Sequence, residues 1–175
     1  MKLNWREFLT PALNKSAKIA VLGIGSLLNC DDAAGMLVIE ELAQCGLDLR
    51  RILLLAGSTA PENFTGVIVD FAPALLIVVD AAKMGLEPGQ IALLEEEELK
   101  EFGFSTHMLP FSIMQQYLKR RIPTDIVLLG IEPARVDFGF DISPPVRKGI
   151  AEIVDFLTHV GAGFHPRPSG FHPRP

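Results

Sequence analysis

The chain has 175 residues, of which 49% are hydrophobic and 21% charged, and its formal net charge is -5. This length allows one sizeable hydrophobic core and is short for two ordinary domains, so we expect a single domain over 17–161. The acidic balance gives no general attraction to nucleic acid or anionic lipid, because both need a surplus of Lys and Arg. A cation or a basic ligand is easier to accommodate.

Residues 1–16 form an N-terminal extension to this domain. Its larger apolar side chains recur at roughly helical spacing, at Leu3, Trp5, Phe8, Leu9 and Leu13. We expect a helix that packs on the domain's own surface. Polar and charged groups throughout the extension argue against a secretory signal, and no apolar run in the chain reaches membrane-spanning length. We therefore expect an unexported, cytoplasmic protein with no membrane insertion.

Short runs rich in Val, Ile and Leu alternate with longer segments of helical character along the domain. This alternation predicts an α/β fold of three layers, α/β/α, with a twisted, mostly parallel five-stranded sheet and helices on both faces. The expected strands are 17–22, 52–56, 75–79, 91–94 and 126–130. The expected helices are 32–45, 61–71, 95–102, 110–121 and 144–160. Asp31 is placed to cap the first of these helices, while Pro61 and Pro144 suit the first turns of two others.

Three further features have structural explanations. Four carboxylates over Glu95–Glu98 are favoured by the helix dipole in a first helical turn. The tail over 162–175 repeats GFHPRP, and its proline density predicts disorder. Cys30 and Cys45 have no metal-type spacing and form no disulfide framework, which fits a reducing compartment.

The stretch GIGSLLNCDDAAG begins like a dinucleotide-binding fingerprint at Gly23 and Gly25. The third glycine position holds Leu28, however, and the second strand ends in Ala56 instead of a ribose-binding acid. Two adjacent aspartates also occupy the positive end of the next helix, where a phosphate would meet like charge. This turn therefore favours a cation, and we expect Gly23, Gly25 and Gly35 to serve the turn and close helix packing.

Two carboxylates and one imidazole are expected at the carboxyl edge of the sheet. Asp32 follows the first strand, Asp80 ends the apolar run LLIVV, and His107 lies in the loop before a helix. Together they make a partial shell for a divalent transition ion. Each also has an ordinary explanation, as a helix N-terminal residue, a turn former and a loop histidine respectively. Nearby carboxylates would raise the pKa of the Cys30 thiol, so we expect that residue to pack and not to react.

Five separated motifs run through this region in a consistent order. They are VLGIGSLLNCDDAAG, GSTAPEN at 57–63, LLIVVDAAKMGLEPG at 75–89, STHMLPFS at 105–112 and LLGIEP at 128–133. With them, the chain resembles the maturation endopeptidases of [NiFe] hydrogenases over about residues 18–157. The resemblance is to the branch that processes large subunits of membrane-associated, hydrogen-evolving hydrogenases.

The resemblance implies a twisted sheet between helical layers and a specific activity. Members of the family remove a C-terminal extension from the large-subunit precursor after nickel has been inserted. The family's nickel-contacting side chains fall on Asp32, Asp80 and His107, which would also be the catalytic groups. The resemblance further implies that the nickel is supplied by the substrate and is not permanently bound to the peptidase.

The family commonly has an acid at the end of the second strand, where this chain has Ala56. That departure keeps an alternative open, in which the protein is a nickel-dependent checkpoint that binds the precursor, or a nickel-insertion chaperone, without cutting. A third hypothesis is a self-sufficient metallohydrolase that acts on unrelated peptides. Either carboxylate could serve as the general base of the peptidase.

Overall fold

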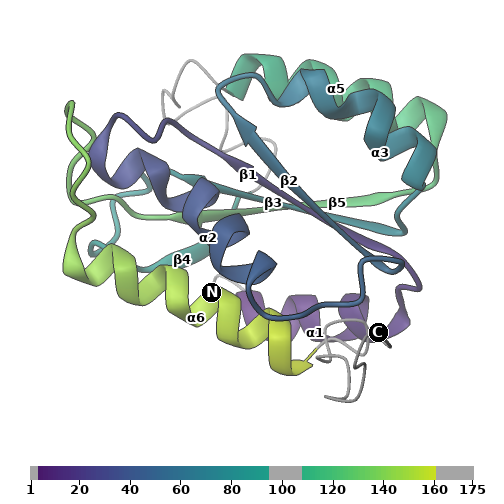
Figure 1. Ribbon diagram of the computed structural model, residues 1–175, viewed down its shortest axis with the longest axis horizontal. Helices are drawn as coiled ribbons and strands as arrows, with labels where there is room; N and C mark the ends of the chain where they lie inside the picture. The colour runs from purple at the N-terminus through teal and green to yellow at the C-terminus, as the bar shows by residue number, and fades with distance from the viewer. Residues whose placement is uncertain (1–3, 95–107, 161–175) are drawn as a thin grey trace, which may run out of the picture.

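The computed structural model describes residues 4–94 and 108–160, and in these ranges it forms three layers (Figure 1). Five strands form one sheet in the order β2-β1-β3-β5-β4, with β4 antiparallel to β5 and the other pairs parallel. The strands are β1 (Ile19–Ile24), β2 (Ile52–Ser58), β3 (Leu75–Ala81), β4 (Ile91–Leu94) and β5 (Asp125–Ile131). The predicted α/β/α architecture with a mostly parallel five-stranded sheet is confirmed.

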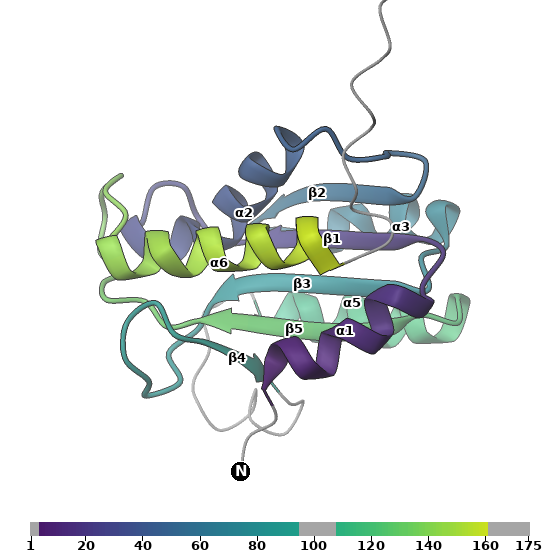
Figure 2. The same ribbon diagram turned by 90° about the horizontal axis from the view of Figure 1, so that it is seen from below.

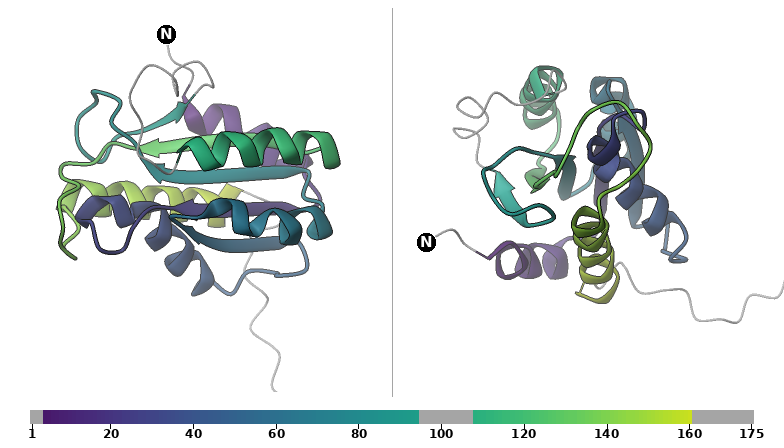
Figure 3. Two further views of the ribbon diagram at one scale, coloured as in Figure 1. Left: turned by 90° about the horizontal axis from the view of Figure 1, so that it is seen from above. Right: turned by 90° about the vertical axis from the view of Figure 1, so that its left-hand side faces the viewer.

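Helices cover both faces of this sheet (Figure 3, right). On one face lie α3 (Thr65–Phe71) and α5 (Met108–Arg121); on the other lie α1 (Trp5–Lys15), α2 (Ala34–Ala43) and α6 (Pro144–Val160). Two short 3-10 turns, η1 (Cys30–Ala33) and η2 (Pro61–Phe64), lead into α2 and α3. None of the helices in the described ranges has the length and apolar character needed to cross a bilayer.

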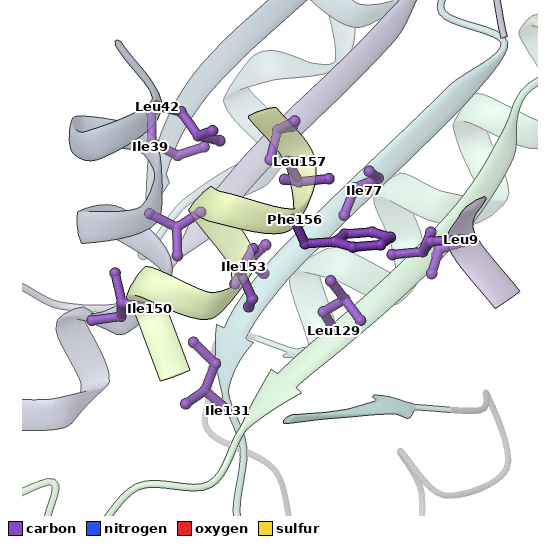
Figure 4. Close-up of a cluster of buried hydrophobic side chains, with 14 of the residues drawn as sticks. Leu9, Ile39, Leu42, Ile77, Leu129, Ile131, Ile150, Ile153, Phe156 and Leu157 are labelled. Atoms are coloured by element: carbon purple, nitrogen blue, oxygen red, sulfur yellow. The ribbon is translucent and has the colours of Figure 1, made fainter. Parts of the chain in front are cut away.

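The central strands are apolar on both faces because each face has its own core. Along β3, Ile77 faces the cluster that contains α1, α2 and α6, whereas Val78 faces α3 and α5. Successive residues of a strand point to opposite sides, which explains why the run LLIVV has no polar position. Figure 4 shows the first cluster, where Ile153 and Phe156 of α6 lie over Ile77 and Leu129.

The N-terminal extension forms the helix α1, which packs on the domain as predicted. Trp5 and Leu9 are buried, and the Trp5 ring meets the Phe156 ring edge-on at a centroid distance of 4.9 Å. A 2.8 Å ion pair from Arg6 to Glu152 ties α1 to α6 at the surface. In Figure 2, α1 and α6 lie side by side on the same face of the sheet. The extension is therefore part of the hydrophobic core.

Three expectations about local structure are wrong. The segment expected as one helix over 32–45 begins with the 3-10 turn η1, and α2 ends at Ala43. Asp31 does not cap a helix, because its carboxylate accepts hydrogen bonds from backbone amides of the loop between β5 and α6. Strand β3 also continues to Ala81, paired with β5, so Asp80 lies within the strand and not after it.

The proline signals are confirmed, since Pro61 lies in the first turn of η2 and Pro144 begins α6. The expected helix over 95–102, the acidic run within it and the tail over 162–175 lie outside the described residues. The division of the chain at 16/17 and 161/162 stays a prediction.

Candidate active site

The order of the strands places a crevice between β1 and β3. The chain passes from β1 to β2 on one side, then crosses back over β1 to form β3 on the other. In open parallel sheets such a reversal opens a ligand-binding crevice at the carboxyl ends of the strands. Asp32, in the turn η1 after β1, and Asp80, the penultimate residue of β3, both lie at this edge. Figure 3 (right) looks onto it.

Glycines let η1 and α2 approach the sheet closely. A Cβ atom on Gly35 would lie 2.2 Å from the Val79 carbonyl oxygen and 2.4 Å from that of Ile24. Gly25 has a φ of +130°, and a Cβ there would lie 1.8 Å from the backbone oxygen of Asp32. Any side chain at these two positions would push the acidic turn away from the sheet. The expected turn and close-packing roles of these glycines are confirmed.

The Asp32 carboxylate is held in place by the loop that precedes it. The side chain is 6% exposed, and its Oδ2 accepts a 2.9 Å hydrogen bond from the backbone N–H of Ser26. A hydrogen bond from a backbone amide to a carboxylate fixes the direction of that carboxylate. Asp32 is therefore a preorganised carboxylate at the mouth of the crevice.

The environment of the Asp80 carboxyl group differs from that of Asp32. Its side chain is 1% exposed, and within the described ranges neither carboxylate oxygen has a hydrogen-bond partner. Burial, with a further contribution from the negative charge of Asp32, raises the pKa of Asp80 to about 8, although the nearby N–H of Ala81 lowers it by a smaller amount. The carboxyl group is therefore mostly protonated at neutral pH in the free protein. An unpartnered buried carboxyl next to a second acid is typical of a functional site.

The direction of the Asp80 side chain follows from its strand. Leu76 and Val78 face the α3 and α5 side of the sheet, and Asp80 shares that face by the two-residue period. Helix α5 covers this face, through Phe111 among others. Asp80 therefore points to the side of the sheet that α5 covers.

The third predicted side chain, His107, lies outside the described residues. Its convergence with Asp32 and Asp80 stays a prediction, and so does the role of all three as catalytic and nickel-contacting groups. Among the residues that the structure does describe, no three His, Cys, Asp or Glu side chains are grouped so as to hold a metal ion.

Asp31, the neighbour of Asp32, has a structural role that the sequence did not reveal. It is fully buried, and its two oxygens accept hydrogen bonds from the backbone N–H groups of Ala134 (2.9 Å), Arg135 (3.0 Å) and Ser143 (2.7 Å). These bonds fasten the loop after β5 to the acidic turn after β1. The two adjacent acids thus have different roles. Asp31 fixes the loop at this edge of the sheet, and Asp32 faces the crevice.

Glu132 is a second buried acid that sequence reasoning missed. Its Oε2 accepts hydrogen bonds from the backbone N–H groups of Met84 (2.6 Å) and Leu86 (3.2 Å), in the connection from β3 to β4. An acid directly after the apolar run of β5 was the available signal. Glu132 fixes the connection that leaves β3 just beyond Asp80.

The family of this chain is identified by comparison with known proteins. A family model described as hydrogenase maturation protease matches residues 36–160, which is most of the chain. The chain belongs to the hydrogenase maturation protease family. As a member of this family it is an enzyme, an endopeptidase of hydrogenase maturation.

Individual relatives support the assignment to the hydrogenase maturation proteases. A putative hydrogenase maturation protease of Methanocaldococcus jannaschii is 31% identical over 161 residues, covering 89% of this chain and 95% of that protein. The hydrogenase 3 maturation protease of Escherichia coli K12 is 31% identical over 138 residues, covering 78% and 86%. The crystal structure of the [NiFe] hydrogenase maturation protease HycI from Thermococcus kodakarensis has a TM-score of 0.75 and 30% identity, covering 87% and 99%.

Ala56, at the position where the resemblance led us to expect an acid, is exposed near the end of β2. It pairs with Gly23 of β1, so it lies at the same edge of the sheet as the acidic turn. The position is exposed but carries no ionisable group.

Proposed function

We propose that the protein removes the C-terminal extension of a [NiFe] hydrogenase large-subunit precursor after nickel has been inserted. The observation that carries this proposal is Asp80, a buried carboxyl close to Asp32 whose two oxygens have no hydrogen-bond partner in the part of the chain that the structure describes. Such a pair is incomplete in the free protein. A cation that arrives with the substrate would complete it.

Nickel carried by the precursor is part of the substrate in this proposal. Carboxylate and imidazole groups are suitable nickel ligands. A nickel ion beside Asp32 and Asp80 would favour the charged form of Asp80, so docking would release the proton that Asp80 holds. A precursor without nickel would leave Asp80 protonated beside Asp32, so it would gain no interaction with an ionised acid pair. The pair would therefore discriminate loaded from unloaded precursor.

Hydrolysis then needs a water molecule at the scissile peptide bond. The docked ion would polarise the carbonyl group or lower the pKa of the attacking water. The water oxygen bonds to the carbonyl carbon, the C–N bond breaks, and the products are a new carboxylate and a protonated amine. Asp32 or Asp80 would accept the proton of the water and pass it to the leaving nitrogen.

His107 is proposed as the third nickel-contacting group. It directly precedes Met108, the first residue of α5, and α5 covers the face toward which Asp80 points. This arrangement supports the proposal without establishing it. The cytoplasm is the proposed location, and the free thiols of Cys30 and Cys45 fit a reducing compartment.

A second candidate function is a checkpoint that binds the precursor or a nickel-insertion chaperone without cutting. The absence of a carboxylate at Ala56, on the same edge as Asp32, favours it. The two candidates differ in one observable, the mass of the precursor after incubation.

The test compares four proteins on nickel-loaded and nickel-free precursor, with the large subunit weighed by mass spectrometry. The wild type should shorten the loaded precursor, while Asp80→Asn and His107→Ala should abolish or strongly slow that cleavage. His159→Ala is the matched control, since this histidine is exposed on α6 and bonds to Asp155 of the same helix. Equal cleavage of loaded and unloaded precursor would refute the nickel mechanism. Binding with no loss of mass would select the checkpoint function.

A further inference from the structure

An apolar surface lies on the same edge of the sheet as the acidic turn. Five large hydrophobic side chains project there from two loops, one after β1 and one between β5 and α6. Their exposed fractions are 42% for Leu27, 53% for Leu28, 36% for Val136, 75% for Phe138 and 71% for Phe140. We call these five residues the apolar lip. Most large hydrophobic side chains in the described residues are buried, so the exposure of these five side chains on two adjoining loops needs an explanation.

The two loops of the apolar lip are joined through their backbones. The N–H of Gly139 donates to the carbonyl of Leu28 (2.9 Å), and the N–H of Cys30 donates to the carbonyl of Gly139 (2.7 Å). Gly139 also lies against Cys30 so closely that a Cβ atom would come within 2.8 Å of its sulfur. In Figure 3 (right), the loop before α6 arches beside the segment that follows β1.

This attachment explains why the two phenylalanines point outward. Gly139 faces inward against Cys30, so its neighbours on either side turn away from the protein. The rings of Phe138 and Phe140 then stand together, edge to face, with centroids 6.0 Å apart. Two adjacent aromatic rings on a fixed loop resemble the anchors that dominate protein interfaces.

The apolar lip is continuous with the candidate active site. Asp31 holds the lip loop through its three backbone hydrogen bonds and is the sequence neighbour of Asp32. An exposed ion pair of 3.7 Å between Arg135 and Asp141 lies beside the aromatic rings. Apolar anchors with a charged border are the usual composition of a protein docking surface. A protein bound here would have its surface next to the crevice that contains the two acids.

We propose that the apolar lip docks the hydrogenase large-subunit precursor, through an apolar patch on the precursor surface. This inference rests on the proposed function, which requires a folded protein to present one peptide bond at the acidic pair. Docking on the lip holds the body of the precursor while its C-terminal segment enters the crevice. Loss of the lip weakens precursor binding and raises KM, and it leaves kcat at saturating precursor close to that of the wild type.

The test measures both binding to immobilised nickel-loaded precursor and its cleavage. The double variant Phe138→Ser, Phe140→Ser should bind at least ~10-fold more weakly, as expected when two interface anchors are removed. Leu49→Ser is the matched control, because Leu49 is 61% exposed and precedes β2, at the opposite end of the strands. Leu28→Ser provides an independent lip variant if the double variant does not fold. Near-UV circular dichroism and Tm verify the fold of each.

The outcomes separate this inference from the proposed function. Cleavage by the wild type with unchanged binding by both lip variants refutes the apolar lip and leaves the peptidase function intact. If the wild type binds the precursor without cleaving it, and the lip variants lose that binding, the peptidase function is refuted and the role of the apolar lip is supported. A wild-type dimer in sedimentation that becomes monomeric on Phe138→Ser, with precursor binding unchanged, would make the lip a contact between copies of this chain and overturn the proposal.

Discussion

Replacement of Asp80 by Asn should change how the stability of the protein depends on pH. The pKa of Asp80 is raised from its ordinary value of 3.8 to about 8, chiefly by burial and then by the charge of Asp32. In the unfolded chain the same carboxyl ionises near pH 4. Between these two values the folded protein holds a proton that the unfolded chain has released. The contribution of Asp80 to stability is therefore greatest below pH 4 and is lost as the pH rises toward 8.

The magnitude follows from the size of the shift. A displacement of about 4 pKa units, at roughly 1.4 kcal/mol per unit, makes the folded state about 6 kcal/mol less stable at high pH than below pH 4. Asn is similar in size and stays neutral throughout. The stability of Asp80→Asn relative to the wild type should thus increase by roughly 1.4 kcal/mol per pH unit from pH 5 to 7 and level off above pH 8.

Urea unfolding of both proteins at pH 5, 6, 7, 8 and 9 measures this difference. Asp125→Asn is the control, because Asp125 is an exposed carboxylate at the start of β5. Its unfolding free energy should follow that of the wild type across the series. A constant difference between Asp80→Asn and the wild type would show that Asp80 is ionised in the folded protein, and the argument for an incomplete acid pair would fail.

Three further substitutions test the supporting structure by urea unfolding. Gly35→Ala should cost more than ~3 kcal/mol, because its Cβ would meet backbone oxygens at 2.2 and 2.4 Å, whereas Gly66→Ala, with open space at its Cβ, should cost little. A mild effect at Gly35 would contradict the close approach of α2. Asp31→Ala should cost at least ~3 kcal/mol, since three backbone amides lose their acceptor. Trp5→Ala should cost about 3 kcal/mol and Phe8→Ala, at an exposed position, under ~1 kcal/mol. Equal effects of the two substitutions would contradict the packing of α1 in the core.

The sequence predicts most of the fold because its apolar runs are unusually clear. Strands buried on both faces read as continuous Val, Ile and Leu, and the prolines at 61 and 144 mark the beginnings of helical segments. The boundary errors have a common origin. The strands continue into residues that pair across the sheet, as Asp80 does with Gly130, and such long-range pairing leaves no local signal.

The candidate site is predicted only in part for a related reason. Asp32 and Asp80 are recognisable because an acid beside a buried strand needs a partner or a task. The structural role of Asp31 depends on hydrogen bonds from backbone amides more than a hundred residues away in the chain. No local pattern therefore distinguishes Asp31 from Asp32. The apolar lip is also hidden from sequence reasoning. Exposed phenylalanines read as ordinary core residues until the fold places them at the surface.

The central claim is that the two acids recognise nickel that arrives with the precursor. The most direct measurement is the ratio of initial cleavage rates, by the wild type at pH 7, on nickel-loaded and nickel-free precursor. The acid pair predicts a ratio of about 10 or more, since at pH 7 a carboxyl with a pKa of about 8 is mostly protonated until the ion displaces its proton. A ratio close to one, with both precursors shortened at the same position, would contradict it.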